Sequence, residues 1–183
     1  MFKKPKEGTL TSLIVISLII NLLFLFLFII PVEISLKSIS NYGTLDLISA
    51  DYSDKAVTIL NSWGNKGKNK LLIKTIFNFL FIISYVVFLT SVLILSFRKL
   101  PEKFKVKSLF RMTFLPLFAG IFDFITNVFL IFILVGFVKV GNVFFIIFWT
   151  AGIAFVCVYF SICTILFDWL VILLMKTKNK LTQ

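Results

Sequence analysis

A single carboxylate, Asp123, lies inside the apolar stretch Leu115 to Phe129, which reads LPLFAGIFDFITNVF. If this stretch spans a bilayer, a charge there costs at least ~2.5 kcal/mol, so the acid needs a partner or a task. Asn127 follows one helical turn later on the same face. An acid and an amide so placed can bind a ligand or exchange a proton, or they can join helices as a neutral hydrogen-bonded pair. Both interpretations stay open, and both make Asp123 the first candidate residue.

Polar side chains in the other apolar stretches are expected to meet this acid. Asn78 and Tyr85 are seven residues apart and return to nearly the same helical face. Asn21 lies in the middle of the first stretch, where an interhelical hydrogen bond is the alternative to a ligand contact. At 1.5 Å per residue, these groups and Asp123 reach similar depths, roughly 15 to 18 Å from one boundary. The predicted polar layer consists of Asn21, Tyr85, Asp123 and Thr164, extended outward by Asn127, Tyr159 and Asn78.

The composition identifies the class of protein that must position these groups. Of the 183 residues, 60% are hydrophobic and 24 are Phe, and the mean hydropathy is +1.06. A soluble domain of this size could not bury so much apolar surface. Strand-like alternation is absent, so helices must satisfy the backbone in lipid. We expect an all-α integral membrane four-helix bundle that forms one domain over residues 1–183, with spans at about 11–32, 71–97, 113–138 and 143–175.

The positions of the charges predict the orientation. The net charge is +11, and most cations fall on one side of a four-span chain, which the positive-inside rule makes cytoplasmic. N-in and C-in are therefore expected, in the cytoplasmic membrane, with anionic lipid headgroups as partners of the cations. Orientation accounts for these charges, so no nucleic acid is implied. The cytoplasmic clusters are Lys3, Lys4 and Lys6; Arg98, Lys99, Lys103, Lys105, Lys107 and Arg111; and Lys176, Lys178 and Lys180.

The chain contains no His and only two cysteines, Cys157 and Cys163. The usual His or Cys metal cluster and the Ser-His or Cys-His nucleophilic pair are thereby excluded. The two thiols fit small apolar positions of the fourth span. No cofactor, metal or catalytic residue is predicted, and the sequence favours a protein that is not an enzyme.

The predicted outer loop, residues 33–70, is the one sizeable polar segment. Ser53 is a suitable N-cap for a short amphipathic helix through Trp63, which Gly64 would end. This helix is expected to lie on the membrane surface or to cover the outer mouth of the bundle, with Trp63 at headgroup level. The next stretch, GNKGKNK, is expected to be a flexible basic turn.

Two further charged residues receive ordinary interpretations. Lys74 lies about one turn inside the outer boundary and shares a face with Asn78, so it is expected to extend its ammonium to the interface without a partner. Asp168 lies about two turns from Lys176, and an interfacial carboxylate is the preferred interpretation.

Two stretches, NFLFIISY at 78–85 and LPLFAGIFDFITN at 115–127, resemble an uncharacterised group of small bacterial four-span membrane proteins. In that group the third helix reads LPLLAxLxDLLEN, and the segment SDKAVTILNSWGNKG also matches its loop. The likeness covers roughly residues 50 to 130. Asn78 and Thr126 stand where the group has acids, while Asp123, Asn127 and Tyr85 are kept. The resemblance implies the four-span architecture and the choice of residues, and it implies binding or structure rather than catalysis.

Three functions follow as hypotheses from the sequence. The first is binding of a small amphipathic or lipid-like ligand in an intramembrane polar cavity lined by Asp123, Asn127, Tyr85, Asn78 and Asn21. The second is a non-catalytic accessory or assembly subunit that packs against partner membrane subunits. The third is an oligomeric transporter or pore, although the chain shows no inverted repeat or interrupted helix pair.

Overall fold

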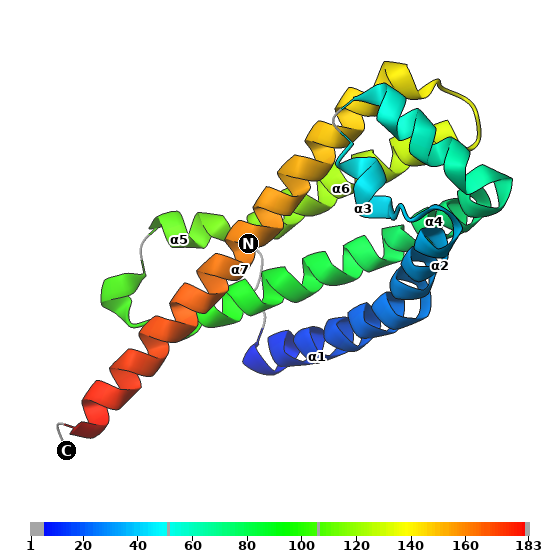
Figure 1. Ribbon diagram of the computed structural model, residues 1–183. Helices are drawn as coiled ribbons and strands as arrows, with labels where there is room; N and C mark the ends of the chain where they lie inside the picture. The colour runs from blue at the N-terminus through cyan, green and yellow to red at the C-terminus, as the bar shows by residue number, and fades with distance from the viewer. Residues whose placement is uncertain (1–5, 51, 106, 182–183) are drawn as a thin grey trace.

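The computed structural model describes residues 6–50, 52–105 and 107–181, and every regular element among them is helical (Figure 1). Four helices are long and apolar enough to cross a membrane, which supports the all-α, multi-pass prediction. The elements are α1 (Glu7–Phe24), the π-helical segment η1 (Leu25–Ile29), α2 (Ile30–Ser40), α3 (Thr44–Ile48), α4 (Ser53–Lys99), the 3-10 segment η2 (Glu102–Phe104), α5 (Lys107–Met112), α6 (Leu115–Leu134) and α7 (Val140–Leu181).

The first span bends where its helix changes type. Pro31 has no N–H to donate to the preceding turn, so the regular α-helical hydrogen bonding is interrupted there. The π-helical segment Leu25–Ile29 ends two residues before this proline. Such a segment is a recognised cause of a kink. In Figure 1, α2 turns away from the direction of α1 toward α3. This bend brings Glu33, in the first turn of α2, toward the beginning of the second span.

Helix α4 contains a break at Gly64, whose φ of 58° and ψ of −168° are not helical. The positive φ explains why glycine occupies the position. Residues 53–63 precede this break as a separate helical segment. The stretch after it was expected to be a flexible turn, and that prediction is wrong, because residues 65–70 are helical and continue into the span. Without a proline to interrupt it, the basic stretch can join the helix that follows.

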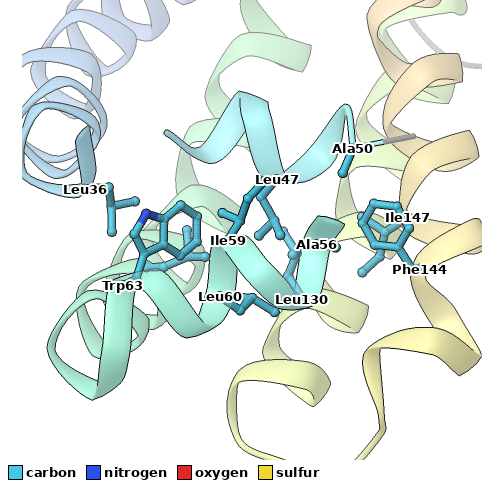
Figure 2. Close-up of a cluster of buried hydrophobic side chains, with 11 residues drawn as sticks. Leu36, Leu47, Ala50, Ala56, Ile59, Leu60, Trp63, Leu130, Phe144 and Ile147 are labelled. Carbon is cyan, nitrogen blue, oxygen red and sulfur yellow. The ribbon is translucent and has the colours of Figure 1, made fainter. Parts of the chain in front are cut away.

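The helical segment before Gly64 packs into the protein (Figure 2). Trp63 is only 2% exposed, and its indole N–H donates to the carbonyl of Tyr42 at 3.0 Å. Trp63 therefore belongs to the hydrophobic core, and its expected depth at the headgroup level stays a prediction. Together with α3, this segment covers one end of the molecule. The buried cluster consists of Leu36, Leu47, Ala50, Ala56, Ile59, Leu60, Trp63, Leu71, Leu130, Phe144 and Ile147.

Helix α4 is the central span. Helix α1 packs against α4, while α6 and α7 pack against each other and against α4. Within the described residues, α1 makes no more than isolated contacts with α6 or α7. Residues at the start of α1, α5 and the end of α7 lie toward one end of the molecule, and α2, α3 and the break in α4 lie toward the other (Figure 1). Helix α1 is thus held in the bundle mainly by α4.

The third span ends earlier than expected, at Leu134 rather than 138. Gly136 has a φ of 80°, and the N–H of Phe137 donates back to the carbonyl of Phe132 at 2.9 Å. This is the usual way in which glycine ends a helix, by satisfying carbonyls of the last turn. Of the predicted cytoplasmic cations, Lys3 and Lys4 lie outside the described residues, as do the side chains of Lys107, Lys178 and Lys180.

Candidate functional site

A hydrogen-bonded network joins α4 to α6 around Asp123. The hydroxyl of Tyr85 donates to Asp123 Oδ2 at 3.3 Å. Asn127 Nδ2 donates to Asp123 Oδ1 at 3.0 Å and to the backbone oxygen of Asp123 at 2.6 Å. Asn78 Nδ2 donates to Asn127 Oδ1 at 3.1 Å. The structure therefore brings together four of the five residues that the sequence singled out.

Helical periodicity and one glycine place these four side chains. Asn78 and Tyr85 share a face of α4, and Asp123 and Asn127 are one turn apart on α6. Gly120 lies one turn before Asp123, and a Cβ there would come within 2.5 Å of Val86 Cγ2. Its missing side chain lets the two helices approach closely. That approach allows the short Asp123 carboxylate to reach the Tyr85 hydroxyl.

The network lines a cavity of about 520 Å³. This volume is within the range of small-molecule sites, roughly 300 to 1,000 Å³. All four spans contribute to its walls: the first supplies Leu25 and Ile29 of η1, and α7 supplies only apolar side chains. The walls are mainly apolar, with polar groups at a few positions. The apolar lining includes Leu25, Ile29, Leu71, Phe81, Phe88, Leu89, Leu130, Ala151, Ala154, Phe155, Val158 and Ile162.

A second polar group lies at the end of the cavity that α3 covers. Lys74 Nζ is 3.5 Å from Glu33 Oε2 and donates to the hydroxyl of Thr44 at 2.8 Å. Both Glu33 oxygens accept from the Thr44 N–H, at 3.0 and 3.1 Å. The Gly43 backbone lies so close to Glu33 that a Cβ would collide with Oε1. The prediction of an unpartnered Lys74 is therefore wrong, because the bend of the first span carries an acid to it.

Three residues of the predicted polar layer lie outside the cavity. Asn21 is not among the lining residues, and its side-chain oxygen is buried without a hydrogen-bond partner. Tyr159 is 66% exposed on α7, and the hydroxyl of Thr164 donates to the carbonyl of Phe160 on its own helix. The estimate from equal depth correctly brought together the polar residues of α4 and α6. It failed for α1 and α7, because the depth of a residue does not say toward which side of the helix its side chain points.

Sequence reasoning missed two sets of polar contacts at this site. Glu33 and Thr44 were not candidates, although a charge beside a helix-bending proline was an available signal for Glu33. The hydroxyls of Thr126 and Thr150 lie 2.7 Å apart and connect α6 to α7. Thr126 lines the cavity. Threonines inside apolar spans are frequent, so their pairing had no distinct signal in the sequence.

Asp168 is not the interfacial carboxylate that was expected. It is 1% exposed, and Ser96 of α4 donates to its Oδ2 at 2.9 Å. Its other oxygen is buried with no hydrogen-bond partner. One turn further along α7, Val171 and Ile172 form a buried apolar cluster with Leu100. Helix α4 covers the face of α7 that carries Asp168, which distance along α7 alone could not reveal.

The polar residues that line the cavity offer hydrogen bonds and charge. Within the described ranges, no three His, Cys, Asp or Glu side chains gather in a way that could hold a metal ion. Asp123 accepts hydrogen bonds from two side chains and still has acceptor capacity, since a carboxylate offers about four lone-pair sites. The arrangement can therefore orient and hold a polar group within an otherwise apolar space.

No protein-family model, curated protein or solved structure matches this chain. The resemblance of residues 50 to 130 to small four-span proteins stays a prediction.

Proposed function

We propose that this membrane protein binds a small amphipathic or lipid-like molecule in the cavity around Asp123. The observation that carries the proposal is the cavity itself, about 520 Å³ of mainly apolar space with few, convergent polar groups. That combination is characteristic of small-molecule sites, where apolar walls supply affinity and polar groups fix orientation. A purely structural role for Asp123 would need only the hydrogen bonds to Tyr85 and Asn127 and no adjoining space.

The proposed setting is the cytoplasmic membrane, with both termini inside. Among the described residues, the predicted cytoplasmic cations lie at or near the start of α1, the end of α4, α5 and the end of α7, which are found toward the same end of the molecule (Figure 1), in agreement with the positive-inside rule. Segment 98–111 would meet anionic lipid headgroups there. The cap formed by α3 and residues 53–63 would then face outward. Cysteine accessibility at Lys66→Cys and Lys103→Cys in intact cells tests this orientation, with labelling by an impermeant reagent expected only at the first position.

Filling the cavity tests the proposed function. Ala154 of α7 is buried and lines the cavity, so Ala154→Phe should occupy the space that the ligand needs. Gly152→Phe is the matched control, because it adds the same side chain to the same helix where a Cβ meets nothing within 4 Å. Native mass spectrometry of the purified proteins should find a retained small molecule in wild type and Gly152→Phe and lose it in Ala154→Phe. Equal retention in all three contradicts the proposal.

A second candidate function is that of an accessory subunit, and the first span favours it. Only 6% of its most apolar 18-residue window is buried, against 28 to 33% in the other spans. Its remaining surface is available to lipid or to a partner span. Purification in mild detergent should then retain a partner membrane protein, and its loss on polar substitution of Ile16 and Ile19, both exposed on α1, would place the contact there.

A further inference from the structure

The charges that line the cavity do not balance. Lys74 is the one cation among the lining residues that the structure describes, and it is paired with Glu33 at 3.5 Å. Asp123 also lines the cavity, and its hydrogen-bond partners, Tyr85 and Asn127, are uncharged. Counted as ionised, the cavity groups carry one negative charge in excess, and that charge belongs to Asp123.

A ligand can supply the missing positive charge. A buried carboxylate is costly unless it is paired and hydrogen-bonded. Tyr85 and Asn127 supply hydrogen bonds to Asp123 but no opposite charge. An anionic head would have to approach Asp123 or displace Glu33 from Lys74. With Asp123 ionised, a neutral head would leave the excess charge uncompensated.

The side chains around Asp123 also suit a cation. Phe81 and Tyr85 line the cavity with ring centroids 5.7 Å apart, and Phe88 and Phe155 add two more rings to its wall. Aromatic faces attract cations, and the attraction is stronger where water is excluded. Rings that also offer apolar surface fit a poorly hydrated cation, such as a substituted ammonium, better than a compact metal ion.

The space between the first span and α7, both of which line the cavity, is the route that we infer for such a molecule. Helix α1 makes no more than isolated contacts with α7 in the described part of the chain. Phe155 lines the cavity and is 60% exposed. An amphipath dissolved in the bilayer would enter between the first span and α7, past Phe155.

From these observations we propose that the cavity selects amphipaths with a cationic head of the alkylammonium type. The head pairs with the Asp123 carboxylate, and the apolar part of the molecule lies along the apolar lining of the cavity. This inference rests on the proposed function and adds the charge of the ligand to it.

The test compares three ligands of equal chain length: decyltrimethylammonium, decanol and decyl sulfate. Equilibrium dialysis against nanodiscs of zwitterionic lipid, with and without the full-length protein, separates binding to the protein from partition into lipid. We expect saturable binding of the ammonium compound, tighter than that of the alcohol, with no saturable binding of the sulfate. Asp123→Asn should weaken ammonium binding by about 30-fold, as expected for loss of one partner of a buried charge pair, and should leave binding of the alcohol within about 2-fold.

Asp168→Asn is the matched control, because Asp168 is a buried acid that does not line the cavity. It should leave all binding unchanged. If the alcohol binds as tightly as the ammonium compound, or if the sulfate binds more tightly, the charge inference is wrong. The proposed function survives either result when Ala154→Phe removes the binding. If no compound binds in a way that Ala154→Phe abolishes, both proposals fail.

Discussion

Two acids lie within the apolar spans of this protein, and their surroundings differ. Asp123 accepts hydrogen bonds from Tyr85 and Asn127 and borders a cavity. Asp168 is 1% exposed, receives one hydrogen bond from Ser96, and keeps one oxygen without a partner. The first acid has several donors and space for a further group. The second is sealed between α4 and α7 beside an apolar cluster.

This difference shows which buried acids can serve a ligand. An acid with adjoining space can exchange or gain a partner, whereas a sealed acid depends on the few groups that already touch it. Stability should therefore respond differently to the loss of a donor at the two sites. Interhelical hydrogen bonds in membranes contribute only about 0.6 kcal/mol on average, because the unfolded state in the bilayer also finds partners. Reversible unfolding of variants in SDS mixed micelles measures the contrast.

The largest effect is expected for Asn127→Leu. This change removes two hydrogen bonds to Asp123 and one from Asn78, so the free energy of unfolding should fall by about 2 kcal/mol. Asn78→Leu removes only one of these bonds and should cost about a third as much. Equal losses in the two variants would mean that Asn127 does not hold the Asp123 side chain.

Ser96→Ala should have the next largest effect, a loss of about 1 kcal/mol. The change removes the donor to Asp168 Oδ2 and leaves the carboxylate buried without that bond. Ser91→Ala, which deletes a buried hydroxyl from the same helix, is the control. If the free energy of unfolding falls no further in Ser96→Ala than in the control, the hydrogen bond from Ser96 to Asp168 contributes little to stability.

Tyr85→Phe should cost less than Ser96→Ala, about 0.6 kcal/mol. Asp123 keeps Asn127 as a donor in this variant, and the phenyl ring preserves the cavity wall. The order of these two losses is the direct test of the comparison. If Tyr85→Phe is the more destabilising change, Asp123 is the acid that depends on one partner.

The smallest effect is expected for the double variant Ser96→Ala, Asp168→Leu. Replacing both members of a buried polar pair by apolar groups of similar shape is often nearly neutral. Its stability should lie within about 0.5 kcal/mol of wild type, above that of Ser96→Ala alone. A double variant less stable than either single variant would assign Asp168 a role beyond its bond to Ser96.

Much of the fold and part of the candidate site could be predicted from local pattern. The apolar runs around residues 11–32, 71–97 and 143–175 all lie in helices long enough to span a membrane, because run length and composition decide membrane insertion. The polar stripe at Asn78 and Tyr85 and the pair Asp123 and Asn127 were visible for the same reason, since helical periodicity fixes which residues share a face.

What the sequence by itself determined is therefore the identity of the spans and the polar faces of α4 and α6. Tertiary structure decided which faces meet. The bend before α2 paired Glu33 with Lys74, the packing of α4 on α7 buried Asp168 beside Ser96, and the rotation of α7 turned Tyr159 outward. These outcomes depend on contacts between residues far apart in the chain. Local periodicity carries no information about the rotation of one helix relative to another. That rotation decided that Asp123 lines a cavity and that Asp168 is buried between α4 and α7.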